Sequence, residues 1–212
     1  LYSNSVTAGG AFIGAVKRGV KLIVVDPRCT PTSEHADIHL RPIPGTDGAL
    51  ALGMARVIIT EGLQNQEYID KYTIGFDEYK DYVLQFTPER VEEITGVPKE
   101  DMTAAARLMA KEAPCPIQLS ASPVVHNVNG MQNARAIVLL LALTGSFGVE
   151  GGTLPPGPGR AVLREAFLGT MHARVDADQD LSHEEFPAWA RLTAQEAQVT
   201  RLADYMEGKG AY

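Results

Sequence analysis

The sequence predicts an α/β protein built on a parallel sheet, and two observations support this fold class. The short apolar run LIVV at residues 22–25 directly follows a helical pattern over residues 7–19, as in the helix-to-strand part of a βαβ unit. The run shows no polar alternation, so we expect a strand buried on both faces. Residues 116–121 are expected to form a second buried strand. Residues 1–5 are too few for a preceding strand, so we expect the first strand of the sheet to lie upstream.

Helical periodicity accounts for most of the chain up to residue 143. Asn65 and Thr87 are suitable N-caps, and Gly62 and Gly96 are suitable helix terminators. We expect helices at residues 7–19, 47–61, 65–72, 76–86, 88–95, 97–113, 129–143 and 194–206.

A loop rich in glycine and proline follows at residues 144–159 and is incompatible with regular structure. Beyond it the chain is more polar and shows little apolar periodicity. We therefore divide the chain into a nucleotide-binding domain at residues 1–150 and a tail at residues 151–212. The tail is expected to be irregular and helical and to belong to an adjoining domain.

The composition is ordinary for a globular protein and excludes several classes of function. A net charge of −7 disfavours nucleic acid as a partner, because binding to phosphates needs a basic face. No apolar stretch reaches the ~20 residues that span a bilayer, so we expect no direct membrane insertion. Two cysteines are too few for a disulfide scaffold or a cysteine-bound cluster, and two free thiols are the favoured state.

The stretch from residue 21 to residue 47 is the strongest candidate for a binding site. A second extended segment, residues 36–41, follows the first strand, and each of the two ends in a loop that carries an aspartate. Nucleotides bind outside the carboxyl ends of parallel strands. Asp26 could accept hydrogen bonds from a ribose diol, or it could be a turn former before Pro27. Arg28 could pair with a diphosphate, or it could be a solvated loop residue.

The second loop contains the turn Pro44-Gly45-Thr46-Asp47, which begins a helix. Gly45 permits the turn, and either Thr46 or Asp47 could cap the helix. If the carboxylate of Asp47 points outward, it can accept two hydrogen bonds from the N1 and N2 edge of a guanine. If it points inward, it is an N-cap.

Other polar clusters support a site less well. His35 and His39 would not converge on one ion in an extended segment, so a metal site there is disfavoured. The acidic turn at residues 176–180 lacks the glycine and glutamate of a calcium loop. His126 follows the second expected strand and could reach a phosphate or a pterin, although a single loop histidine is more often structural.

Taken together, these motifs resemble the nucleotide-binding domain of the molybdopterin oxidoreductases, the dimethyl sulfoxide reductase family. The resemblance rests on VVDPRCTPTSEHADIHLRPIPGTDGALALGM, on the helix pair TPERVEEITGVPKEDMTAAARLMAKEA, and on HNVNGMQNARAIVLLLALTGSFGVEGG. It covers residues 1–152 well and the tail loosely, and it implies a Rossmann-like three-layer domain.

The resemblance implies a molybdenum or tungsten bis(molybdopterin guanine dinucleotide) cofactor, of which this segment binds one guanine dinucleotide. The parent enzyme would carry out redox or oxygen-atom-transfer chemistry, while this chain alone would be inactive. Its expected partners are the remainder of the catalytic subunit and an iron–sulfur electron-transfer subunit. The metal ligand and any iron–sulfur cluster are expected outside this span. The implied cofactor-binding residues are Ser3, Asn4, Ser5, Asp26, Pro27, Arg28, Thr30, Gly45, Thr46, Asp47 and His126.

In this assignment Asn4 contacts the dinucleotide near its diphosphate, the loop from Asp26 to Thr30 surrounds ribose and diphosphate, and His126 lies beside the family's pterin-side loop. Cys29 belongs to the guanine end of the site and is not a metal ligand. The sequence departs from the family pattern at Tyr2, Ser5 and Val125, where the family often has glycine, proline and glutamine.

Two other functions are compatible with a nucleotide-binding α/β domain. The first is an NAD(P)-binding dehydrogenase domain, which is disfavoured because no Gly-x-Gly-x-x-Gly joins a strand to a helix. The second is a non-catalytic nucleotide-binding or interaction module, in which Asp47 would be only a helix cap.

Overall fold

A computed structural model describes residues 6–119, 124, 126–154 and 207 of the chain. The chain divides into two compact units, Leu1–Pro155 and Pro156–Tyr212, and the structure described below belongs to the first. The helix predicted at residues 194–206 and the acidic turn at residues 176–180 lie outside the described residues, as do residues 1–5.

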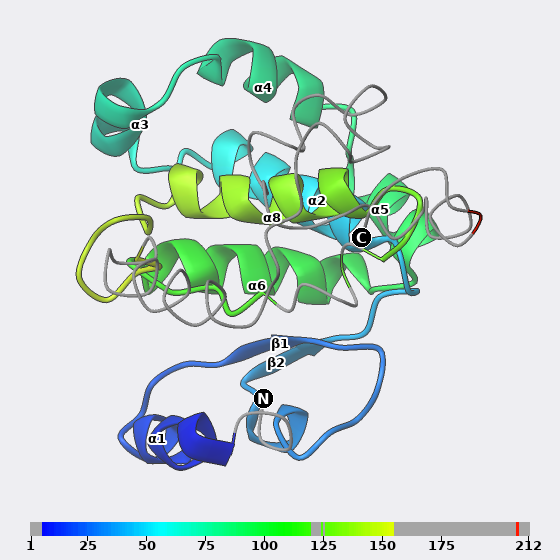
Figure 1. The fold of residues 1–212 in the computed structure, drawn as a ribbon. Coiled ribbons are helices and arrows are strands. Elements are labelled where there is room, and N and C mark those ends of the chain that lie inside the picture. Colours follow the sequence, from blue (N-terminus) through cyan, green and yellow to red (C-terminus); the bar gives the residue numbers. More distant parts are fainter. Residues whose placement is uncertain (1–5, 120–123, 125, 155–206, 208–212) are drawn as a thin grey trace. The chain divides into compact units, whose positions relative to one another are not determined.

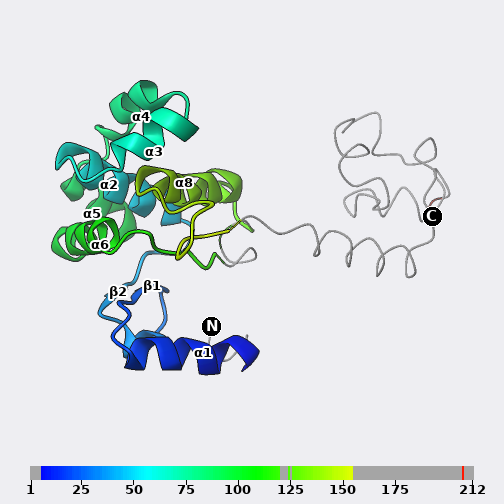
Figure 2. The same cartoon turned by 90° about the vertical axis from the view of Figure 1, so that its left-hand side faces the viewer.

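The described residues form an α/β structure with a small parallel sheet. Helix α1 (Val6–Lys17) precedes strand β1 (Ile23–Val25), and the 3₁₀ helix η1 (Ser33–His35) connects β1 to strand β2 (Ile38–Leu40). The two strands are parallel and in register, with Ile23 opposite Ile38 and Val25 opposite Leu40. Figures 1 and 2 both show this sheet between α1 on one side and α6 on the other. The α/β class and the parallel pairing of the strands agree with the prediction, while the Rossmann-like three-layer domain stays a prediction.

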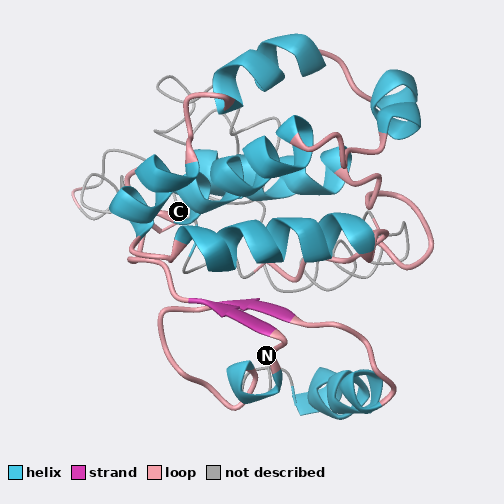
Figure 3. Cartoon of the chain, turned by 180° about the vertical axis from the view of Figure 1, so that it is seen from behind, coloured by secondary structure: helices cyan, strands magenta, loops and turns pink. Residues whose placement is uncertain are grey.

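Helices make up most of the remaining described chain (Figure 3). They are α2 (Asp47–Thr60), α3 (Gln66–Tyr72), α4 (Phe76–Val83), α5 (Pro88–Thr95), α6 (Lys99–Lys111) and α8 (Gly130–Leu143). Their positions agree with the predicted helical segments. The two predicted caps are confirmed, because the side chains of Asn65 and Thr87 accept hydrogen bonds from the backbone N–H groups of Tyr68 and Arg90.

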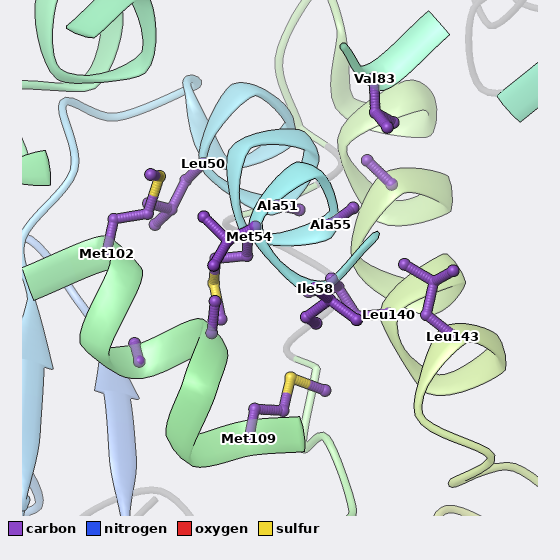
Figure 4. Packing of buried hydrophobic residues seen from close by; sticks show 14 of the residues in the cluster. Leu50, Ala51, Met54, Ala55, Ile58, Val83, Met102, Met109, Leu140 and Leu143 are labelled. Atoms are coloured by element: carbon purple, nitrogen blue, oxygen red, sulfur yellow. The ribbon is translucent and has the colours of Figure 1, made fainter. Parts of the chain in front are cut away.

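The core is centred on α2, which packs against α6 and α8 (Figure 4). Residues on most of its faces are buried, including Leu50, Met54 and Ile58, because helices surround it. Met102 of α6 and Leu140 of α8 fill the space on its two sides. This packing fixes the N-terminus of α2 relative to the sheet and to α8.

Two predictions about strands are wrong. Residues 116–119 are described and form no strand. Instead, side-chain hydroxyls of the glycine-rich turn hold this segment: Ser146 Oγ accepts from Cys115 N (3.1 Å) and Thr153 Oγ1 accepts from Ile117 N (3.0 Å). Strand β1 is also not buried on both faces, since Val25 is 46% exposed.

The glycine-rich turn is irregular as predicted, up to the last described residue of the loop, Leu154. Gly145, Gly148 and Gly151 have positive φ, and a single bridge pairs Phe147 with Thr153. Among the described residues, no helix is both long and apolar enough to cross a membrane.

Candidate functional site

The predicted site lies beyond the carboxyl ends of the two parallel strands. β1 ends at Val25 and leads into the loop that begins with Asp26, while β2 ends at Leu40 and leads into the turn before α2. The backbone N–H of Asp26 donates to the carbonyl of Leu40 (3.1 Å), so the two loops begin side by side. This is the edge at which open parallel sheets bind nucleotides.

The first loop is a tight turn organised by its own side chains. One carboxylate oxygen of Asp26 accepts a hydrogen bond from the backbone N–H of Arg28 (2.9 Å) and lies 3.5 Å from the Arg28 Nε. Thr30 and Ser33 bond reciprocally, with Thr30 N donating to Ser33 Oγ (2.8 Å) and Ser33 N donating to Thr30 Oγ1 (3.2 Å). The turn presents the Arg28 side chain, which is 80% exposed, to solvent.

His39 in β2 and Arg41 just after it hold the backbone of this loop. A ring nitrogen of His39 lies 2.9 Å from the carbonyl oxygen of Asp26, and the Arg41 Nε donates to the carbonyl of Pro27 (3.3 Å). At the other end of the sheet, Asp37 accepts from Lys21 Nζ and from the backbone N–H of Leu22 (both 2.8 Å). The Lys21 ammonium lowers the pKa of Asp37, with the Leu22 N–H as a further cause. His39 and Asp37 thus both have structural partners.

The second loop is a turn that is anchored to the helical layer. The backbone N–H of Ile43 donates to the carbonyl of Thr95 (2.8 Å), and the Thr46 hydroxyl donates back to Ile43 (2.6 Å). Gly45 has φ of 90°, a conformation that side-chain-bearing residues rarely adopt, and a Cβ there would meet nothing closer than Asn127 Cγ at 4.0 Å. The turn is therefore open on the side where a ligand could approach.

Neither Thr46 nor Asp47 caps α2 with its side chain. Thr46 occupies the N-cap position without a side-chain cap bond, and Asp47 is the first residue of the helix. The Asp47 carboxylate has no hydrogen-bond or ion-pair partner among the described residues and is only half-buried. The interpretation of Asp47 as the N-cap is therefore wrong, and its role as an acceptor for guanine stays a prediction.

The cap comes instead from Asn133, a residue of α8 that sequence reasoning did not identify. Its side-chain oxygen accepts from the backbone N–H of Gly48 (3.2 Å), and its amide nitrogen donates to the carbonyl of Gly45 (3.1 Å). Asn133 is 5% exposed. Nothing in the sequence singled out a contact across 85 residues.

The structure brings the loop of His126 to the same turn. His126 is exposed, and the next residue, Asn127, lies near Gly45 and within 3.5 Å of the Asn133 amide. Asn127 also closes its own loop by accepting from Asn129 N (3.0 Å). Ser3, Asn4 and Ser5 lie outside the described residues, so the structure does not connect them with these loops.

The two loops carry groups that can form hydrogen bonds and ion pairs with a ligand. Within the described part of the chain, no three histidine, cysteine, aspartate or glutamate side chains gather where they could hold a metal. Cys29 is a free, exposed thiol in the first loop, and Cys115 is also free. The Arg28 guanidinium can pair with a phosphate, the second oxygen of Asp26 can accept from a hydroxyl, and Asp47 can accept from paired N–H donors.

Comparisons with known proteins agree on one family. A family model for molybdopterin oxidoreductase matches residues 4–179. The chain is 36% identical over 138 residues to the probable oxidoreductase YoaE of Bacillus subtilis (strain 168), covering 65% of this chain and 20% of the relative. It is 32% identical over 213 residues to dimethyl sulfoxide reductase DmsA of Escherichia coli (strain K12), covering 91% of this chain and 25% of the relative.

A solved structure is similar as well. Acetylene hydratase from Pelobacter acetylenicus matches with a TM-score of 0.65 and 39% identity, covering 68% of this chain and 20% of that chain. The chain thus spans about a fifth to a quarter of the length of these proteins.

Proposed function

The chain belongs to the molybdopterin oxidoreductase family, and on this premise we propose that it binds the guanine end of one molybdopterin guanine dinucleotide. It would do so as one segment of a longer catalytic subunit, in a Rossmann-like domain whose sheet other segments complete. The relatives' greater length supports this arrangement.

The observation that carries the proposal is the free carboxylate of Asp47. It follows directly on the open turn at Gly45, and no group of the described chain competes for its oxygens. A carboxylate is an acceptor on both oxygens, and guanine presents two adjacent N–H donors at N1 and N2. Adenine presents no such pair, so Asp47 would select guanine.

The first loop would bind the sugar and the diphosphate. Asp26 uses one oxygen for the Arg28 N–H, which leaves the other to accept from a ribose hydroxyl. Arg28 is exposed and can pair with the diphosphate, and Pro27 and Thr30 shape the loop around it. Thr46 and His126 would complete the contacts around the Gly45 turn, while Ser3, Asn4 and Ser5 would contact the dinucleotide near its diphosphate.

In the assembled enzyme this segment would bind and orient the cofactor, and residues elsewhere in the subunit would hold the metal. The molybdenum or tungsten centre, when bound, supplies redox or oxygen-atom-transfer chemistry. An iron–sulfur cluster and an electron-transfer subunit remain proposals for the whole enzyme. Cys29 has no metal-binding role in this assignment.

Calorimetric titration of the chain with GDP, ADP and NAD tests the proposal. We expect GDP to bind and ADP and NAD to bind at least tenfold more weakly, because only guanine offers two donors to Asp47. Tight NAD binding without a GDP response would instead support a dehydrogenase domain. No binding of any nucleotide would support a non-catalytic module. For the complete enzyme, elemental analysis that finds neither molybdenum nor tungsten would contradict the cofactor assignment.

A further inference from the structure

The N-terminus of α2 is held by a side chain from another helix. A helix begins with backbone N–H groups that lack partners within the helix, and a side chain just before it usually caps one of them. In α2 this local cap is missing, and Asn133 of α8 accepts from Gly48 instead. The same amide donates to the carbonyl of Gly45, two residues before the first residue of the helix. One buried side chain therefore satisfies both ends of the turn that carries Asp47.

The fit between Gly48 and Asn133 depends on the absence of a side chain at residue 48. A Cβ on Gly48 would collide with the Asn133 side-chain oxygen, and it would lie 3.2 Å from the Asn133 Cα. Gly48 is buried and has no positive φ, so conformational freedom does not explain the glycine. Close approach of α8 to the N-terminus of α2 does explain it.

We propose that Asn133 is a positioning residue for guanine binding, because it caps α2 from α8 and thereby leaves the Asp47 carboxylate free for the ligand. The inference rests on the proposed function and deepens it. Without Asn133, the Gly48 N–H would lack its partner. The Asp47 carboxylate of the preceding residue is an acceptor that could then turn inward to replace it. The Gly45 carbonyl would lose its donor at the same time, so the turn would lose both restraints.

Two variants of Asn133 separate its two hydrogen bonds. Asn133→Ala removes both. Asn133→Asp is nearly isosteric and keeps an acceptor for Gly48, but it cannot donate to Gly45. Gln132→Ala is the matched control, since Gln132 is the adjacent, exposed residue of the same helix. Gly48→Ala displaces the Asn133 side chain while keeping its chemistry.

The experiment measures GDP affinity by calorimetry and the exchange rate of the Gly48 amide by NMR. We expect Asn133→Ala and Gly48→Ala to weaken GDP binding about tenfold and to speed amide exchange at residue 48, and Gln132→Ala to stay within about twofold of wild type. Asn133→Asp should keep the Gly48 amide protected and bind GDP with intermediate affinity. In an Asp47→Ala background, Asn133→Ala should weaken GDP binding by less than about twofold, because Asn133 acts through Asp47.

Each outcome decides the inference. If wild type binds GDP and Asn133→Ala binds it equally well, the positioning role is wrong and the proposed function stands. If Asn133→Ala weakens binding by the same factor with and without Asp47, the residue does not act through that carboxylate and the inference is also wrong. If wild type binds no GDP, the proposed function fails and the role assigned to Asn133 fails with it. If Asn133→Ala does not fold, the GDP affinities of Asn133→Asp and Gly48→Ala test the inference instead. Wild-type affinity in both variants would then show that the positioning role is wrong.

Discussion

Gly53, in the middle of α2, lies where both α5 and α6 approach this helix closely. A Cβ on Gly53 would lie 2.6 Å from Met102 Sδ of α6, and 2.8 Å and 3.1 Å from the two γ-methyl carbons of Val91 in α5. Met102 and Val91 are both fully buried. The substitution Gly53→Ala therefore adds a methyl group to a site with no room for it.

Two opposing effects determine how much Gly53→Ala changes the free energy of unfolding. Replacing glycine by alanine inside a helix stabilises it by about 0.5–1 kcal/mol, whereas one extra methyl group in a packed core costs about 1–3 kcal/mol. The steric cost should dominate because Val91 is β-branched and its methyl carbons cannot rotate away freely. We expect Gly53→Ala to lower the free energy of unfolding by about 1 kcal/mol.

Chemical denaturation followed by circular dichroism measures this change, and Gly14→Ala is the control. Gly14 lies in α1, where only the end of the flexible Arg18 side chain comes within 3.3 Å of the added Cβ, so alanine should stabilise the protein there. Val91→Ala should destabilise the Gly53→Ala variant by about 1 kcal/mol less than it destabilises the wild type, because it makes room for the added methyl group. Stabilisation by Gly53→Ala, or strict additivity with Val91→Ala, would refute this description of the helix packing.

Two further predictions concern titratable groups. Asp37→Asn should destabilise the protein near pH 7, because Asp37 links Lys21 and Leu22 at the start of the sheet. The pKa of Asp37 is lowered in the folded protein, so the ion pair contributes stability above the ordinary pKa of 3.8 and loses it as the pH falls through the lower folded-state pKa. The pH–stability curves of wild type and variant should therefore converge in acid. Curves that stay apart by a constant amount down to low pH would contradict the ion pair. Thiol labelling of the native protein should modify Cys29, which is exposed, well before Cys115, because burial raises the pKa of the Cys115 thiol against the opposing effect of its Ser146 contact. Equal labelling rates at pH 8 would show that the turn holding Cys115 is open in solution.

Local signals in the sequence predicted the features that depend on local chemistry. The caps Asn65 and Thr87, and the helix end at Gly96 with its positive φ of 71°, follow from residue types at fixed spacing. The two loops after β1 and β2 were also predictable, because a strand followed by Asp-Pro or by Pro-Gly-Thr-Asp must turn.

Features that depend on distant contacts were not predictable. Residues 116–119 have the composition of a strand, but hydroxyls from Ser146 and Thr153 take up the backbone N–H groups of residues 115 and 117. Val25 looked like a core residue, yet it is 46% exposed on the described part of the sheet. Asn133 caps α2 by accepting from Gly48, 85 residues earlier in the chain, and no spacing rule connects the two residues.

We propose that Asp47 accepts hydrogen bonds from the N1 and N2 donors of guanine, and the substitution Asp47→Asn is the sharpest test of this contact. An asparagine amide can accept from the N1–H of xanthine and donate to its O2, where guanine carries an amino group. Calorimetry with GDP and with xanthosine diphosphate should therefore show preference for GDP in wild type and for xanthosine diphosphate in Asp47→Asn. A variant that keeps the wild-type preference for GDP would show that Asp47 does not contact the base.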